Sequence, residues 1–113
     1  MPQYAILIYQ DESSYADPAA LDRLIKEHGA FMERNGSALR GGSGLHTVET
    51  ATSIRKDSSG GFTVTDGAFV ETKEALGGYY VIEVSDLDEA IAVATQVPAS
   101  GGGVEVRPLR VAG

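Results

Sequence analysis

Two stretches of sequence decide the fold: YAILIY at residues 4–9 and YYVIEV at residues 79–84. Both are rich in aromatic and β-branched residues, and each has the length of one strand. Each is followed by a helix-start signal, because Asp17 precedes a proline and Asp86 precedes an apolar helical pattern. A strand followed by a helix therefore occurs twice, which is typical of α+β structure.

The remaining elements follow from periodicity and turn residues. A helix is expected over residues 18–34, because apolar side chains and His28 recur at helical spacing, and Asn35-Gly36 ends it. A second helix is expected over residues 86–97, with Glu89 completing a capping box and Pro98 ending it. Shorter strands are expected at 37–40, 51–56, 62–65 and 104–109, and the glycine-rich residues 41–44 are expected to end the first of these strands.

This order predicts a ferredoxin-like βαββαβ fold with an inserted β-hairpin, in a single domain spanning residues 1–113. Both crossover helices of such a fold cover the same face of the sheet. The central strands are nonetheless apolar on both faces, since Ala5, Leu7 and Tyr9 alternate with equally apolar neighbours. We therefore expect a homodimer packed sheet to sheet, a dimeric α+β barrel, unless the hairpin or a tail covers the second face.

Composition narrows the function classes. The chain has no cysteine and a formal net charge of -7. These values argue against disulfides, thiolate chemistry and nucleic-acid binding. No secretion signal or membrane-length apolar run is visible, so a cytoplasmic protein without membrane contact is expected. The two histidines are not spaced as metal ligands, and no phosphate loop is present, so neither a metal nor a cofactor is expected.

The connection after the hairpin is the first candidate site. It carries Asp66, Glu71 and Lys73 within a short irregular segment. A carboxylate there could act as general base and the lysine could hold an anion. The structural alternative is that Asp66 caps its own turn while Glu71 and Lys73 form exposed ion pairs.

Four further residues are candidates. His28 could serve as a base near neutral pH, or it could simply pack in its helical stripe. Tyr79 and Tyr80 point to opposite faces of one strand, so one hydroxyl could line a ligand cavity, with core packing as the alternative. Arg107 could bind a ligand carboxylate, or it could pair with a glutamate across strands.

The stretch DGAFVETKEALGGYYVIEV at residues 66–84, with DLDEA at 86–90, resembles the YCII-related proteins of the DGPF subgroup. The similarity extends to TSIR at 52–55 and VEVRPL at 104–109. The resemblance implies a bacterial protein that forms a dimeric α+β barrel, in a subgroup without an established reaction that often occurs beside sigma factors. Ala68 stands where the subgroup has proline. A His–Asp pair proposed as catalytic in a related branch is not carried over to His28.

Three functions remain open at this stage. The first is a cofactor-free enzyme that performs acid–base chemistry on a small metabolite. The second is a non-catalytic ligand-binding or regulatory module linked to sigma-factor systems. The third is a structural dimer without a ligand. A cavity lined by titratable side chains would favour the first of these functions.

Overall fold

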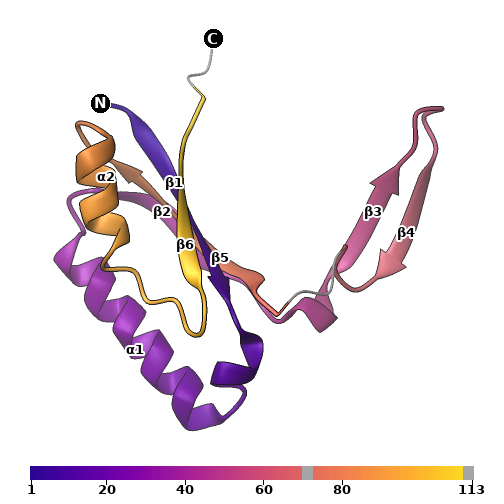
Figure 1. Ribbon diagram of the computed structural model, residues 1–113, viewed down its shortest axis with the longest axis horizontal. Helices are drawn as coiled ribbons and strands as arrows, with labels where there is room; N and C mark the ends of the chain where they lie inside the picture. Colours follow the sequence, from indigo (N-terminus) through magenta and orange to yellow (C-terminus); the bar gives the residue numbers. More distant parts are fainter. Residues whose placement is uncertain (70–72, 111–113) are drawn as a thin grey trace.

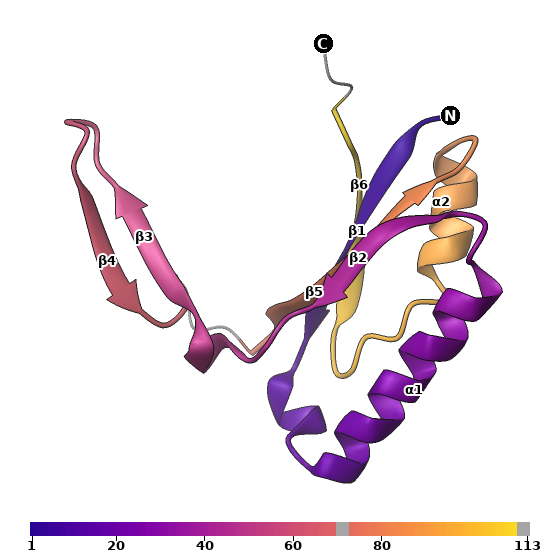
Figure 2. The ribbon, with the colours of Figure 1, turned by 180° about the vertical axis from the view of Figure 1, so that it is seen from behind.

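The computed structural model describes residues 1–69 and 73–110. Its main sheet has four antiparallel strands in the order β2-β5-β1-β6. These strands are β1 (Gln3–Gln10), β2 (Leu39–Gly44), β5 (Ala75–Glu83) and β6 (Gly103–Pro108). The helices α1 (Pro18–Arg34) and α2 (Leu87–Ala94) lie on the same side of this sheet (Figures 1 and 2). The predicted α+β class is confirmed, and the strand order is consistent with a ferredoxin-like fold.

The two stretches that decide the fold form the centre of the sheet. Ile6 of β1 pairs with Tyr80 of β5, and both residues are buried. Alternate residues of β1 point towards the helices, where Phe31 of α1 is fully buried with Ile6 and Ile82. The core therefore lies between the sheet and the two helices, on one face of the sheet.

Local signals position the second helix more firmly than the first. The Asp86 carboxylate accepts a hydrogen bond from the Glu89 backbone N–H at 2.9 Å, and the Glu89 carboxylate accepts one from the Ser85 N–H at 2.7 Å. This reciprocal arrangement is the predicted capping box, with Ser85 supplying the second donor. Asp17 precedes α1 as predicted, but its side chain makes no capping hydrogen bond. The last turn predicted for α2 is not α-helical, since α2 ends at Ala94.

The strand predicted at residues 37–40 runs further than expected, because β2 continues through the glycine-rich residues 41–44. These residues pair with residues 78–81 of β5. Gly42 has φ +148°, and a Cβ there would lie 2.6 Å from the carbonyl oxygen of Tyr79. Backbone pairing with a neighbouring strand, which a local pattern does not encode, therefore overrides the low strand propensity of glycine.

The face of the sheet away from the helices has no cover within the described residues (Figure 2). Leu7 and Tyr9 of β1 are only half-buried there, and Tyr79 of β5 is 39% exposed. Continuous apolar runs are typical of strands that are buried on both faces. In the single chain, the side chains on this face are instead partly exposed to solvent.

The inserted segment forms a separate two-stranded hairpin of β3 (Thr52–Lys56) and β4 (Phe62–Asp66). It stands away from the main sheet (Figure 1). Ile54, Phe62 and Val64 share one face of the hairpin and are all more than half exposed. Two short 3-10 helices, η1 (Glu12–Tyr15) and η2 (Val48–Thr50), lie in the connections. No helix in the described part of the chain has the length and apolar character needed to cross a membrane.

Candidate functional site

The predicted polar connection does not converge on one point. Asp66 is exposed at the end of β4, and its carboxylate has no hydrogen-bond or ion-pair partner among the described residues. The turn that follows is held instead by the Gly67 N–H, which donates to the Ala51 carbonyl at 2.7 Å, and by the Ser53 hydroxyl, which donates to the Gly67 carbonyl. The side chain of Asp66 therefore does not cap this turn.

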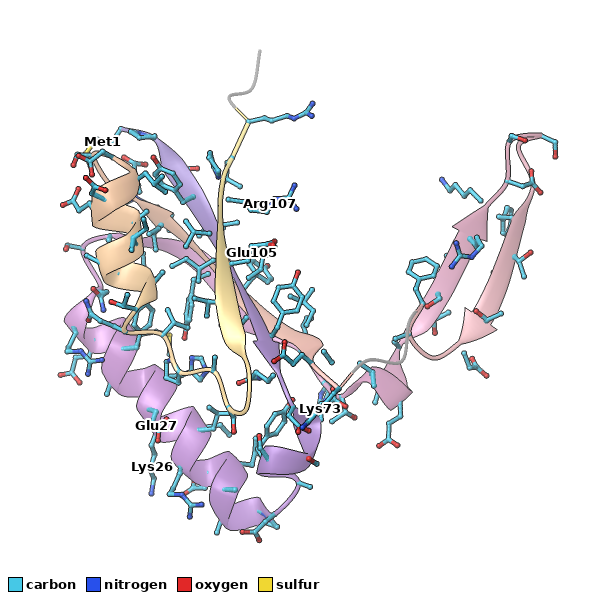
Figure 3. All side chains as sticks on the ribbon, viewed as in Figure 1. Met1, Lys26, Glu27, Lys73, Glu105 and Arg107 are labelled. Carbon is cyan, nitrogen blue, oxygen red and sulfur yellow. The ribbon has the colours of Figure 1, made fainter. Side chains whose placement is uncertain are left out.

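The other two members of the cluster lie elsewhere. Glu71 falls outside the described residues. Lys73 is exposed at the end of the sheet, beside the chain that leaves β1 (Figure 3). Hydrogen bonds from Ser13 lower the pKa of the Asp11 carboxyl, and the charge of Lys73 adds to this effect. Asp11 is thus one electrostatic partner of Lys73.

A hollow does exist where the connection meets the end of the sheet. This junction cavity measures about 680 Å³, and its walls include Tyr9, His46, Ser53, Phe69 and Glu74. Phe69 also lies under the Arg55 guanidinium, whose carbon is 4.9 Å from the ring centroid. The connection contributes Phe69 and Glu74 to this cavity, whereas Asp66 and Lys73 are not part of its wall.

A second hollow lies between α1 and the β2–β5 edge of the sheet. We call it the helix–edge cavity; its volume is about 290 Å³, and its walls include Ile8, Gln10, Ile25, His28, Gly44 and Tyr80. A further hollow of about 350 Å³ adjoins it and shares Gln10, Ile25, His28, Gly44 and Gly77. Together they form a continuous apolar depression of the size that small-molecule sites have.

His28 and Tyr80 form a hydrogen-bonded pair in the wall of the helix–edge cavity. The Nδ1 atom of His28 lies 2.7 Å from the Tyr80 hydroxyl oxygen. The helical stripe of α1 turns the histidine towards the sheet, and the β5 register turns Tyr80 towards the helices. The Tyr80 ring is backed by Phe31, with ring centroids 4.8 Å apart. Packing therefore holds both side chains in place.

Burial keeps both members of this pair uncharged near neutral pH. It lowers the pKa of His28 from its usual 6.5, with Glu27 acting weakly in the opposite direction. Burial also raises the pKa of the Tyr80 hydroxyl. A neutral imidazole has one donor and one acceptor nitrogen, so the pair can either accept or donate a proton at the free Nε2 atom.

The lowered pKa of His28 has a measurable consequence. Between the folded and unfolded pKa values the unfolded chain binds more protons, so this group's contribution to stability is present above about pH 6.5 and is lost as the pH falls further. An NMR titration of the His28 ring should give a midpoint below 6.5, and His28→Gln should lose less melting temperature on acidification than the unaltered chain. A midpoint at or above 6.5 would contradict the burial of this ring.

The remaining predicted residues lie outside the pair. Tyr79 points to the opposite face of β5 from Tyr80, as predicted, although it also borders the helix–edge cavity. Arg107 projects from β6 on the side away from the helices, next to Glu105 (Figure 3). It forms no ion pair with any described residue; Glu83 pairs instead with Arg40, at 3.6 Å. No three His, Asp or Glu side chains group as metal ligands in the described ranges.

Sequence reasoning named His28 and Tyr80 separately and did not pair them. It also missed Gln10, Ile25 and the glycines of the cavity wall. One signal was available in the sequence. In a strand, Tyr80 and Ile82 point to the same face, and the apolar stripe of the helix that contains His28 is expected to cover the buried face of the sheet.

These observations define a class of protein: a small α+β domain in which helices cover one face of the sheet and a histidine–tyrosine pair lines an apolar cavity. Within that class, the chain belongs to the YCII-related domain family, whose sequence model matches residues 2–111. An uncharacterised protein of Rhizobium meliloti (strain 1021) is 37% identical to it over 112 residues, which cover 94% of this chain and 90% of that protein. The resemblance inferred from the sequence is therefore confirmed at the level of this family.

Proposed function

We propose that this chain binds a small metabolite in the helix–edge cavity and exchanges a proton with it through His28 and Tyr80, without a cofactor. The observation that carries the proposal is the 2.7 Å contact between His28 Nδ1 and the Tyr80 hydroxyl at the cavity wall. When Nδ1–H donates to Tyr80, the lone pair of Nε2 accepts a proton from the ligand. When the Tyr80 hydroxyl donates to Nδ1, Nε2–H donates to the ligand.

This chemistry suits the transfer of a proton from one atom of a ligand to another. The proton leaves one ligand atom, resides on the imidazole and returns to the same molecule, so the balance needs no oxidant, reductant or second substrate. An uncharged histidine is the form that acts as base, and its lowered pKa keeps it in that form at neutral pH.

A non-catalytic binding module is the second candidate. The observation that favours it is that the cavity wall is mainly apolar and contains no pre-formed charge apart from what the pair can acquire. Such a wall suits recognition without chemistry. In that case the ligand would be recovered unchanged, and the protein would act by changing a partner's behaviour, as the sigma-factor context of the resembling subgroup implies.

We also propose the junction cavity as a second ligand site, to which the predicted polar connection would contribute. Phe69 and Glu74 already border that hollow, and Asp66, Glu71 and Lys73 belong to the same connection. A ligand bound there would respond to Glu74→Gln, because Glu74 lines that hollow, and would be indifferent to changes at Tyr80, so the two sites can be told apart.

We also propose a homodimer in which the open sheet faces of two copies meet. Leu7, Tyr9 and Val81 are half-buried on that face, and a second copy would cover them. The exposed apolar face of the hairpin supports the same conclusion, since an isolated two-stranded hairpin is marginally stable in water.

The test begins with a metabolite screen by thermal shift, because a ligand of the native state raises the melting temperature. For a compound that is converted, we expect His28→Gln to lower kcat/KM by roughly 10²-fold or more, the usual size for loss of a general base. For a compound that is only bound, we expect Tyr80→Phe to weaken binding about tenfold, close to 1.4 kcal/mol.

Tyr4→Phe is the matched control. Tyr4 is a buried tyrosine on the same sheet face, and it lines neither hollow beside α1. Its loss of a hydroxyl should leave binding and turnover unchanged. A compound that stabilises the His28 and Tyr80 variants as much as the unaltered chain would place its site elsewhere.

A further inference from the structure

The charge content of the cavity walls indicates what kind of molecule the helix–edge cavity takes. Asp, Glu, Lys and Arg make up 22% of the chain. None of them lines the helix–edge cavity or the hollow that adjoins it, within the residues that the structure describes. The acidic Glu27 of α1 borders a different hollow, together with Arg23 and Ser100.

An ion that entered this cavity would lose its hydration without gaining a counter-charge. That exchange is unfavourable, whereas an apolar or neutral polar group leaves water at little cost. The polar side chains that the wall does offer are uncharged: His28, Tyr79, Tyr80, Gln10 and Ser43. They can fix one or two hydrogen-bonding groups of a neutral ligand.

The shape of the wall adds a second constraint. One side consists of paired backbone from β2 and β5, with Gly42, Gly44, Gly77 and Gly78 in it. Two of these glycines have no room for a side chain, because a Cβ would meet the backbone oxygen of Tyr79 at Gly42 and that of Ser43 at Gly78; at Gly77 it would meet the end of the Gln10 side chain. This side of the cavity is therefore a flat peptide surface, and Ile8, Ile25 and Met32 provide apolar contacts around it.

We propose that the helix–edge cavity selects an uncharged, planar ligand: an aromatic ring that carries a hydroxyl or carbonyl group. The ring lies against the glycine wall, and its polar substituent reaches the His28–Tyr80 pair. This inference rests on the proposed function, and it adds the chemical class of the ligand.

Gly44 allows the cavity to be blocked selectively. A Cβ at Gly44 would meet no atom within 4 Å, so a side chain there enters the cavity without displacing the strands. Gly103, at the start of β6, has the same open surroundings and lines neither hollow. Gly44→Leu and Gly103→Leu are thus a matched pair.

The experiment titrates four small probes into the ¹⁵N-labelled chain, each a six-membered ring with a methyl group opposite one polar substituent: p-cresol, 4-methylbenzoate, 4-methylbenzylamine and 4-methylcyclohexanol. Backbone amide shifts of Gly42, Gly44 and Gly78 report on the cavity. We expect p-cresol to shift these amides and to bind at least tenfold more tightly than the other three. Gly44→Leu should weaken p-cresol binding at least tenfold, and Gly103→Leu should leave it unchanged.

A second variant tests whether the uncharged wall excludes charged ligands, and it does not depend on blocking the cavity at Gly44. Ile25 is 60% exposed, so Ile25→Lys alters the cavity wall while leaving the core intact. It should raise the affinity for 4-methylbenzoate several-fold and not that for p-cresol. An unchanged affinity for 4-methylbenzoate would overturn the charge argument.

The outcomes separate this inference from the proposed function. Equal or tighter binding of a charged probe, or of the non-planar alcohol, with sensitivity to Gly44→Leu, overturns the ligand class and leaves the cavity as the site. Absence of shifts at all three glycine amides for every probe overturns the ligand class and the helix–edge cavity together.

Discussion

Leu7→Asp is expected to yield a folded monomer. Leu7 lies on the open face of β1 and is half-buried in the single chain, so water can solvate an aspartate there. In the proposed dimer the same carboxylate would be enclosed between two sheets without a partner, at a cost of several kcal/mol. Sedimentation should show half the mass of the unaltered protein, and circular dichroism should be unchanged.

Two controls make this result specific. Ile6 directly precedes Leu7 but points into the core with no exposed surface, so Ile6→Asp should unfold the chain outright. Leu87 on α2 is 49% exposed and lies on the helix side, so Leu87→Asp should leave the dimer intact. A Leu7→Asp protein that keeps its mass, or an unaltered protein that is monomeric at micromolar concentration, would contradict the sheet-to-sheet interface.

Phe31→Ala is expected to remove a large part of the folding free energy. Phe31 is fully buried, and it is the largest side chain in that condition within the described residues. Its truncation leaves a cavity and costs about 3 to 5 kcal/mol, against a total of about 5 to 15 kcal/mol for a domain of this kind. Urea unfolding monitored by fluorescence or circular dichroism measures this loss.

The neighbouring Met32→Ala is the control, because Met32 is 44% exposed and should cost less than about 1 kcal/mol. Phe31 also backs the Tyr80 ring, so its loss should weaken ligand binding at the helix–edge cavity even under conditions where the variant is folded. Equal stabilities of the Phe31 and Met32 variants would show that the α1–sheet packing is not the main core.

The parts of the fold that sequence predicts well are those with a local cause. The apolar runs of β1 and β5, the capping box at Asp86 and the proline at the start of α1 each act within a few residues. The extent of β2 has no such cause, because its glycines become strand only by pairing with β5. The burial of the apolar stripe of α1 also depends on distant parts of the chain. Ile25 and Met32 border a cavity, and only Phe31 is buried in the core.

The candidate site was predicted less well than the fold. His28 and Tyr80 are 52 positions apart, and their contact depends on the register in which Tyr80 faces Ile6 and on the rotation of α1. Neither quantity follows from residue type. Asp66 and Lys73, by contrast, are close in sequence, yet Asp66 lies at the end of the hairpin and Lys73 lies at the end of the main sheet, near Asp11. Proximity in sequence therefore gave less information about the site than the face on which each residue lies.

The position of β1 in the middle of the sheet sets the timing of folding during synthesis. Tyr4 pairs with Ile82 on one side and with Pro108 on the other, so the strand made early needs neighbours made late. At about 5 to 20 residues per second, the ribosome takes on the order of 5 to 20 seconds to supply the second neighbour. Until β5 emerges, the apolar segment of residues 4–9 has no neighbouring strand, and one of its edges stays unpaired until β6 has left the exit tunnel, so we expect chaperones to bind it during synthesis.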